Sequence, residues 1–247
     1  MTLQTSSRST SITPPAFQLA GSGFAYGDHA VLAPYNLDIA PGETVAILGS
    51  SGCGKSTLLK QIAGLLPGGP DMAGHVAWMA QQDLLLPWAS LRDNILLGAR
   101  LRGEIADLAR ADALLARLGL ADRADSLPQQ LSGGMRQRAA LARTLMEDRP
   151  LVLMDEPFTA LDSITRTAMQ DLACATLADR AVLMVTHDPI EACRMADRIY
   201  LLSGQPAHLQ LVLSLRPGKP RDPLAPDMLP HLRLLQEALQ RNAKSTA

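Results

Sequence analysis

Gly49-Ser50-Ser51-Gly52-Cys53-Gly54-Lys55-Ser56-Thr57 fits the pattern G-x-x-x-x-G-K-[ST], and the rest of the sequence can be organised around it. A short β-rich run, Thr44 to Leu48, precedes it. A helical pattern starts at Lys55, and Gly64 can end it. A strand, a glycine-rich loop and a helix in this order predict a site where backbone N–H groups and a helix dipole surround phosphate oxygens.

The residue types in this loop suit a nucleoside triphosphate with Mg²⁺. Glycines let the backbone curl so that its N–H groups turn inward. Lys55 would neutralise the β- and γ-phosphates, and the Ser56 hydroxyl would complete the coordination of Mg²⁺. Cys53 is not required by this chemistry. The expected phosphate-binding residues are Gly49, Ser50, Ser51, Gly52, Cys53, Gly54, Lys55, Ser56 and Thr57.

An apolar run that ends in two acids, Leu151 to Glu156, is expected to lie beside this loop. In a parallel sheet, ligands bind at the carboxyl ends of the strands, where both acids would emerge. Asp155 can hold the Mg²⁺ shell. Glu156 can orient or deprotonate a water aimed at the γ-phosphate. Together with the loop, these acids predict a site where water attacks the γ-phosphate of a nucleoside triphosphate.

The order of the remaining segments predicts an α/β fold with a mainly parallel sheet. Strand-like runs lie at Phe17–Ala20, Tyr35–Ile39, Thr44–Leu48, Leu151–Met154, Ala181–Thr186 and Ile199–Leu202. Between about Leu84 and Glu147 strand signals vanish. Apolar residues recur there at helical spacing, namely Ile105, Leu108, Leu114, Leu115 and Leu118. Residues 84–147 are therefore interpreted as an inserted helical subdomain.

Three parts are expected along the chain. Residues 1–15 are polar and predict a disordered lead-in. Residues 16–215 form the main domain. Residues 216–247 form a tail with a Pro-rich stretch and one helix, whose apolar residues near one face are Met228, Leu229, Leu232, Leu235 and Leu239. This helix either packs on the domain or makes a regulatory contact.

Composition narrows the class of protein. The 247 residues are 47% hydrophobic and 19% charged, which is typical of a globular chain. A net charge of −1 gives no basic field for nucleic acid. No apolar run is long enough to predict a membrane-spanning helix, and no signal peptide is evident. Three cysteines suit neither a disulfide framework nor a zinc site, which favours a reduced, cytosolic setting.

A third motif, Leu131-Ser132-Gly133-Gly134-Met135-Arg136-Gln137-Arg138, stands between the two nucleotide motifs. Ser132, Gly133 and Gly134 offer exposed N–H groups at an expected helix start, which is a second anion site. The motif resembles the signature of the ATP-binding cassette (ABC) ATPases, which are P-loop NTPases. The resemblance covers Phe17 to Leu213 and implies a mainly parallel core with an antiparallel β edge. It also implies a head-to-tail homodimer in which this turn caps the γ-phosphate held by the second copy.

Further positions take their expected roles from the same resemblance. Tyr26 matches the aromatic that stacks on adenine, and alone it would be a core tyrosine. Gln81 or Gln82 falls at the Q-loop; counting back from Leu85-Leu86-Pro87-Trp88 favours Gln81 as the metal- and water-sensing residue. Asp162, after Ala160-Leu161, resembles the D-loop residue that joins the protomers. His187 matches the switch histidine. The implied catalytic residues are Glu156, His187, Lys55 and Gln81, and the implied metal ligands are Ser56, Gln81 and Asp155.

The resemblance also implies a cellular role. Gln81 to Trp88, with Asp93-Asn94, is similar to a segment of the bacterial importer ATPases for nitrate, sulfonate, taurine and pyrimidine (thiamine) precursors. We therefore expect an ATP- and Mg²⁺-dependent subunit on the cytoplasmic face of the inner membrane, working through separate permease subunits and indirectly a solute-binding protein. The alternatives are an exporter-type ATPase, or a soluble one linked to ribosomes or nucleic acid. The transported solute cannot be read from this sequence.

Overall fold

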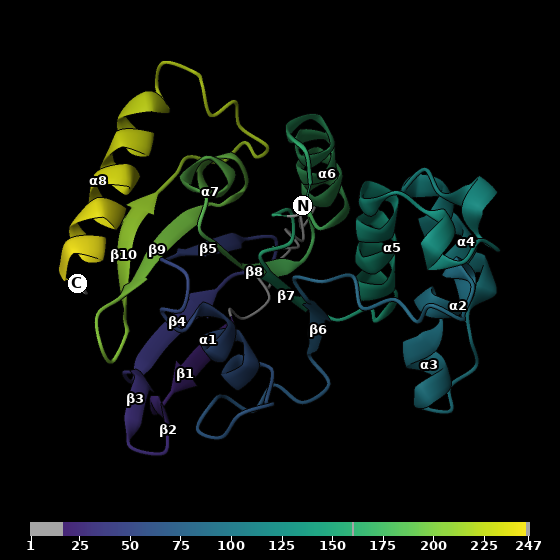
Figure 1. The fold of residues 1–247 in the computed structure, drawn as a ribbon, viewed down its shortest axis with the longest axis horizontal. Helices are drawn as coiled ribbons and strands as arrows, with labels where there is room; N and C mark the ends of the chain where they lie inside the picture. Colours follow the sequence, from purple (N-terminus) through teal and green to yellow (C-terminus); the bar gives the residue numbers. More distant parts are fainter. Residues whose placement is uncertain (1–16, 160, 246–247) are drawn as a thin grey trace, which may run out of the picture.

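A six-stranded sheet forms the centre of the molecule. The computed structural model describes residues 17–159 and 161–245, so the predicted lead-in at 1–15 lies outside the described residues. The strand order is β10-β9-β5-β8-β7-β6. Their bounds are β5 Thr44–Leu48, β6 Val76–Met79, β7 Leu151–Asp155, β8 Ala181–Thr186, β9 Arg198–Ser203 and β10 His208–Ser214. Five strands run parallel and β10 is antiparallel to β9 (Figure 1). The predicted parallel sheet with an antiparallel edge is confirmed.

Two small antiparallel pairs lie against this sheet near the start of the chain. β1 (Phe17–Gly21) pairs with β4 (Tyr35–Ile39), and β2 (Phe24–Tyr26) pairs with β3 (His29–Leu32). Ala207 of the β9–β10 connection bonds to the backbone of Val31 and Ala33, which ties β3 to the main sheet.

Both faces of the sheet are covered. Successive residues of β5 alternate between two apolar clusters, as the period of a strand requires. Val45 and Ile47 pack with α1 (Lys55–Ile62) and the β1–β4 pair. Ala46 and Leu48 belong to the cluster that holds the opposite helices, α6 (Ser163–Thr176), α7 (Pro189–Met195) and α8 (Leu229–Ser245). All residues of β5, β7 and β8 are consequently buried.

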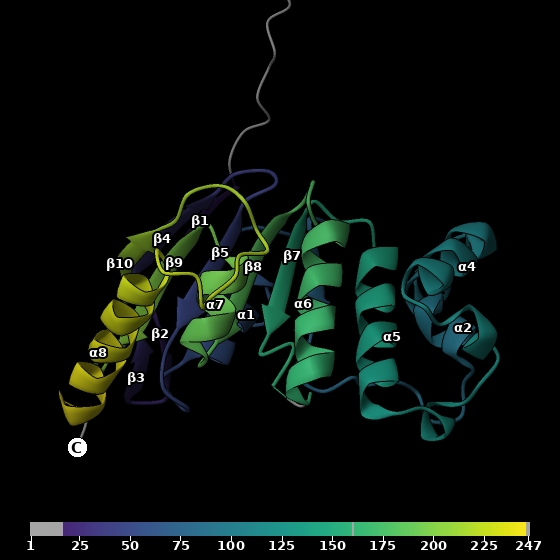
Figure 2. The same ribbon diagram turned by 90° about the horizontal axis from the view of Figure 1, so that it is seen from above.

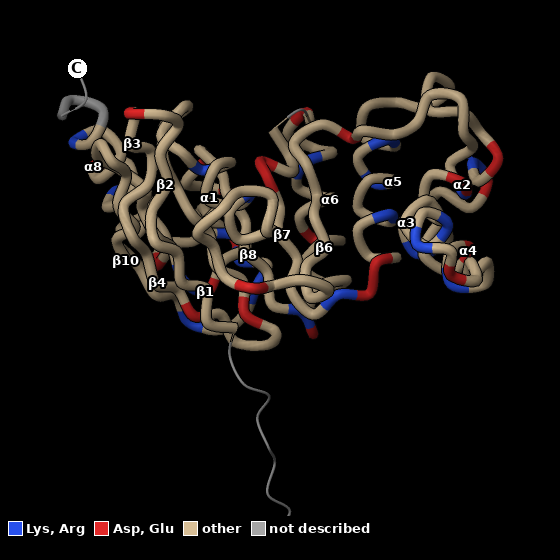
Figure 3. Tube along the Cα trace, turned by 90° about the horizontal axis from the view of Figure 1, so that it is seen from below, with Lys and Arg blue, Asp and Glu red and all other residues tan. Residues whose placement is uncertain are grey.

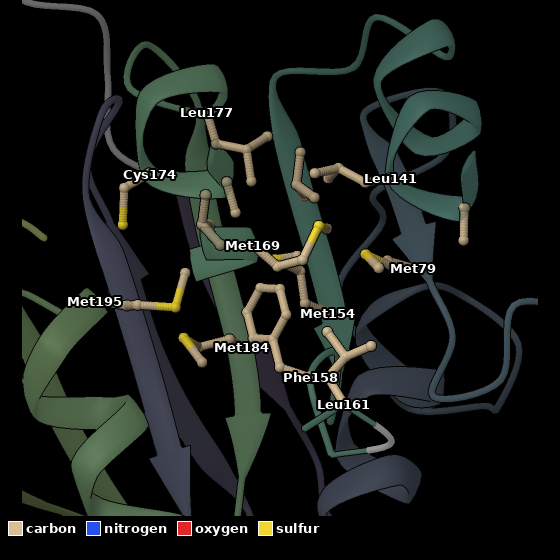
Figure 4. Packing of buried hydrophobic residues seen from close by; sticks show 14 of the residues in the cluster. Met79, Leu141, Met154, Phe158, Leu161, Met169, Cys174, Leu177, Met184 and Met195 are labelled. Carbon is tan, nitrogen blue, oxygen red and sulfur yellow. The ribbon is translucent and has the colours of Figure 1, made fainter. Parts of the chain in front are cut away.

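The cluster that contains Ala46 and Leu48 is called the second cluster here, and Phe158 is its largest fully buried side chain. Figure 4 shows its ring beside Met154 of β7 and Met184 of β8, with Met169 of α6 close by. The ring therefore anchors the segment that follows β7, next to the two predicted acids, Asp155 at the end of β7 and Glu156 after it.

A group of helices extends the molecule to one side of β6 (Figures 1 and 2). These are α2 (Leu91–Ile95), α3 (Leu97–Leu101), α4 (Leu108–Arg117) and α5 (Gly133–Met146), with 3-10 turns at Ala121–Arg123 and Pro128–Gln130. The prediction that Ile105 shares a helix with Leu108 is wrong. Asp107 caps α4 by accepting from the Arg110 amide, so the helix starts after Ile105, which is 99% exposed.

The C-terminal helix α8 packs on the main domain at the other end of the molecule (Figure 2). Met228, Leu232 and Leu235 are buried in the second cluster, and α8 contacts α7 and β9. The predicted packing face is confirmed for these residues, whereas Leu229 is 44% exposed. Throughout residues 17–159 and 161–245, no helix has the length and hydropathy needed to span a membrane.

Candidate functional site

The glycine-rich loop joins β5 to α1 and opens toward solvent. Gly52 and Gly54 have φ of 79° and 106°, which is the left-handed region that glycine adopts without strain. A Cβ on Gly54 would lie 3.1 Å from Leu32 Cδ2, so the loop also needs a small residue there. Gly54 is the N-cap of α1 without a side-chain cap, and the first turn of α1 holds no acid. The loop therefore leaves helix N–H groups available for an anion.

Lys55 folds back into this loop. Its side chain is 5% exposed, and its Nζ donates to the carbonyl oxygens of Gly49 at 2.9 Å and Ser50 at 3.0 Å. The same Nζ lies 3.4 Å from Glu156 Oε1. The buried ammonium of Lys55 is therefore paired with the Glu156 carboxylate at the mouth of the loop.

The ends of β7 and β8 bring the predicted acids to the loop. Ser56 Oγ donates to Asp155 Oδ1 at 3.1 Å. Burial raises the pKa of Asp155 above its ordinary value, and the nearby Glu156 raises it further. Glu156 follows at φ 46°, and its amide donates to the carbonyl of Val185 on β8. His187 Nδ1 lies 3.1 Å from Glu156 Oε2. Lys55, Ser56, Asp155, Glu156 and His187 are thus one cluster.

The donor set fits Mg²⁺ held through substrate phosphates. A hydroxyl and a carboxylate in contact are oxygen ligands that this cation prefers, and the burial of Asp155 is a cost that a cation would offset. Among the described residues, no cluster of three or more His, Cys, Asp or Glu side chains could enclose a metal. A cation here would therefore complete its shell with phosphate oxygens and water.

The loop cysteine offers no reactive thiolate. Burial raises the pKa of the Cys53 thiol, although Lys55 acts in the opposite direction.

The signature residues start α5 and do not contribute to this cluster. Ser132 is the N-cap and accepts from the Met135 amide at 3.3 Å. Gly133 and Gly134 form the first turn. A Cβ on Gly134 would come within 2.7 Å of Thr165 Cγ2 on α6, so close packing of α5 against α6 requires glycine there. Asp162 likewise caps α6, accepting from the amides of Ile164 and Thr165.

The adenine and Q-loop candidates are exposed. Tyr26 is 53% exposed and packs edge-on against Phe24, with ring centroids 4.8 Å apart, so it is not a core tyrosine. Gln81 and Gln82 follow β6 and are both exposed. Trp88, on the loop that follows these glutamines, is 76% exposed.

Several residues that sequence reasoning missed position these elements. Arg136 Nε donates to Asp83 Oδ2 at 3.0 Å, and the Arg143 guanidinium donates to the carbonyls of Asp83 and Leu84. The helix that starts at Ser132 therefore holds the segment after Gln81 and Gln82. The sequence Arg136-Gln137-Arg138 could have indicated this contact, because arginines at the start of a helix need hydrogen-bond or ion-pair partners.

Asn94 organises the loop that carries Trp88. It is fully buried, and its Nδ2 donates to the carbonyls of Leu86, Ala89 and Ser90 while its Oδ1 accepts from the Leu86 amide. Sequence reasoning also missed Glu191, a buried carboxyl on α7 that accepts from Thr186 Oγ1.

Charge on the described surface is mixed. Figure 3 shows Lys and Arg interspersed with Asp and Glu at both ends of the molecule. The distribution along the chain agrees with the net charge of −1.

Comparison with known proteins agrees with this geometry. Residues 32–159 match the ABC transporter family. The aliphatic sulfonates import ATP-binding protein of Rhodococcus jostii is 47% identical, over 76% of this chain and 79% of that protein. An uncharacterised ABC transporter ATP-binding protein of Haemophilus influenzae is 43% identical, over 74% of this chain and 80% of that protein.

A solved structure, described as a metal-chelate type ABC transporter in an inward-facing conformation, has a similar fold. It is 27% identical with a TM-score of 0.69, and the match covers 88% of this chain and 89% of the other. A phosphate loop, two acids and a histidine at neighbouring strand ends, together with these matches, show that the chain belongs to the ABC transporter family and is one of its ATPases.

Proposed function

We propose that this chain is the ATP-hydrolysing subunit of a bacterial importer for a small organic or inorganic solute of the sulfonate, nitrate or pyrimidine-precursor type. The observation that carries the proposal is the position of Glu156, 3.4 Å from Lys55 and 3.1 Å from His187 at the mouth of the phosphate loop. The names of the sulfonate import relatives support the direction and the solute class. Residues 16–215 are the proposed ATPase domain, with 84–147 as its helical part and 216–247 as a tail.

Hydrolysis in this proposal needs positioning rather than covalent catalysis. Residues 49–57 hold the phosphates, and Lys55 exchanges its carbonyl partners for the β- and γ-phosphate oxygens. Ser56 and Asp155, with Gln81, would hold Mg²⁺, which would neutralise charge on the phosphates. Glu156 accepts a hydrogen bond from the attacking water, and His187, beside Glu156, contacts the γ-phosphate.

A second copy completes the site. The contacts of Ser132 and Gly134 lie within α5 and α6, which leaves their exposed turn available to another nucleotide. We propose a head-to-tail homodimer in which Ser132, Gly133 and Gly134 of one copy bind the γ-phosphate held by the other. Asp162 lies at the junction, and Tyr26 stacks on adenine. ATP favours the closed dimer because its γ-phosphate contacts both copies, whereas ADP lacks that contact.

The membrane partner binds near the Q-loop in this scheme. Trp88 exposes a large apolar surface on a loop that the buried Asn94 holds rigid. Leu84, 59% exposed, adds to that surface. We propose that permease subunits dock here, which places the ATPase peripherally on the cytoplasmic face of the inner membrane.

The test is Glu156→Gln, which keeps the side chain's size while removing its basicity. We expect ATP turnover to fall by about a hundredfold or more, with an ATP-bound dimer accumulating in size-exclusion chromatography. Ser132→Arg, which blocks the capping turn, should abolish that dimer and leave ATP binding by the monomer intact. Turnover at the parent rate in Glu156→Gln would show that the water is activated elsewhere.

A further inference from the structure

Thr186, His187 and Asp188 connect the end of β8 to α7, and hydrogen bonds hold the two residues that flank His187. Thr186 is fully buried, while the His187 side chain is 47% exposed. Within residues 17–159 and 161–245, the imidazole has one polar contact, with Glu156 Oε2. Its direction is therefore determined mainly by the backbone at residues 186–188.

The Thr186 hydroxyl bonds to both sides of this connection. Its Oγ1 accepts from the Asp188 amide at 3.1 Å, which closes a tight turn around His187. The same Oγ1 donates to Glu191 Oε2 at 2.5 Å. Asp188 is held a second time, because its Oδ1 accepts from the Ile190 amide and caps α7. The hydroxyl is thus the centre of a network that joins β8, the turn and α7.

Glu191 is an unusual side chain for this place. It is 3% exposed, and its second oxygen, Oε1, has no hydrogen-bond partner among the described residues. A side chain that only filled space on α7 would be apolar, as the neighbouring Ala192 and Cys193 are. The contribution of the carboxyl is the bond it accepts from Thr186, which orients the hydroxyl so that its lone pair faces the Asp188 amide.

We propose that Glu191 is a positioning residue for His187: through Thr186 Oγ1 it fixes the turn at 186–188 and so directs the imidazole toward Glu156 and the γ-phosphate. This inference rests on the proposed function, in which His187 and Glu156 arrange the reacting groups. It concerns the catalytic step and not nucleotide binding, since residues 49–57 form a separate loop.

The experiment compares variants that break the network with variants that keep it. Glu191→Leu and Thr186→Val remove the two hydrogen-bonding groups at similar volume. Glu191→Gln and Thr186→Ser retain an acceptor and a hydroxyl. Cys193→Ala, at a fully buried position of the same helix, controls for loosened packing of α7. For each folded variant, kcat and KM for ATP are measured, together with amide hydrogen exchange across residues 187–190.

We expect Glu191→Leu and Thr186→Val each to lower kcat by about tenfold or more, with KM for ATP within about twofold. Amide exchange at Asp188 should rise in both, while the central β8 amides keep their protection. Combining the two changes should cost little more than either alone, because both break the same network. The Glu191→Gln and Thr186→Ser variants should keep most of the parent kcat.

Three results would overturn the inference. A folded Glu191→Leu variant with the parent kcat would show that the carboxyl is dispensable. An equal loss in Cys193→Ala would assign the effect to packing, and an equal loss in Glu191→Gln would assign it to charge. A separate variant tests the proposed function. If His187→Ala keeps the parent kcat, the role proposed for the histidine is wrong. Amide exchange at Asp188 still reports whether Glu191 fixes the turn.

Discussion

Replacing Glu191 with glutamine should change how the stability of this protein depends on pH. Burial raises the pKa of Glu191 to about 7 from its ordinary value of 4.5, and the bond from Thr186 only partly offsets this. Asp188 and Glu156 raise it further, and Arg166 lowers it. Because the folded-state pKa is the higher one, the protonated form favours folding. That contribution is fully present below pH 4.5 and is lost as pH rises to about 7.

The magnitude follows from the two pKa values. The difference between about 7 and 4.5, at about 1.4 kcal/mol for each pH unit, gives roughly 3 kcal/mol. Most of it falls between pH 5 and pH 8. Glutamine fills the same space and does not ionise in this range, so the Glu191→Gln variant should lack this loss. Its free energy of unfolding relative to the parent should therefore increase by about 2–3 kcal/mol between pH 5 and pH 8.

Urea unfolding followed by circular dichroism at several pH values measures this difference, with the m-value checked for constancy. Glu237→Gln, at an exposed position on α8, removes the same charge without removing a buried carboxyl. Parallel stability curves for the parent and Glu191→Gln across pH 5 to 8 would refute the reasoning. They would mean that the carboxyl is ionised and solvated in the folded protein.

Three further substitutions test the packing and the surface. Phe158→Ala should lower the free energy of unfolding by about 3–5 kcal/mol, because it empties a fully buried ring site; a loss under 1 kcal/mol in urea unfolding would contradict that packing. Gly134→Val should separate α5 from α6, since its side chain would overlap Thr165, and the expected result is a lower Tm that Gly133→Val does not reproduce. Trp88→Ser should change stability by less than about 0.5 kcal/mol, because the ring is exposed, while it weakens binding to permease subunits in a pull-down. Retained permease binding by the serine variant would place the docking surface elsewhere.

The phosphate loop and the two acids at the end of β7 could be located from the sequence because local features encode them. Gly52 and Gly54 stand where the backbone adopts positive φ, and few other residues tolerate that conformation. The apolar run from Leu151 to Met154 is buried on both faces, so it marks a central strand and places Asp155 at its end. Chain order and the rule for parallel sheets were then sufficient to predict that both motifs share one edge.

Other elements lacked such a local signal. β6 has four residues and β10 alternates irregularly in burial, because one is short and the other is an exposed edge strand. The pair β2–β3 was not expected either, because its strands have only three and four residues. The expected helix containing Ile105 failed for a similar reason: Asp107 caps α4, and spacing alone does not show where a helix starts.

The sequence by itself determined the fold class, the family resemblance and the residues nearest the phosphates, since these depend on backbone conformation and hydrophobic pattern within short segments. Only the tertiary structure decided which polar side chains become buried. Glu191 reads as an ordinary surface acid on a short helix until α7 packs on the sheet and removes it from water. Arg136 finds Asp83 only because α5 crosses the chain after β6. Burial and distant pairing arise from the packing of whole elements, and no local pattern records them.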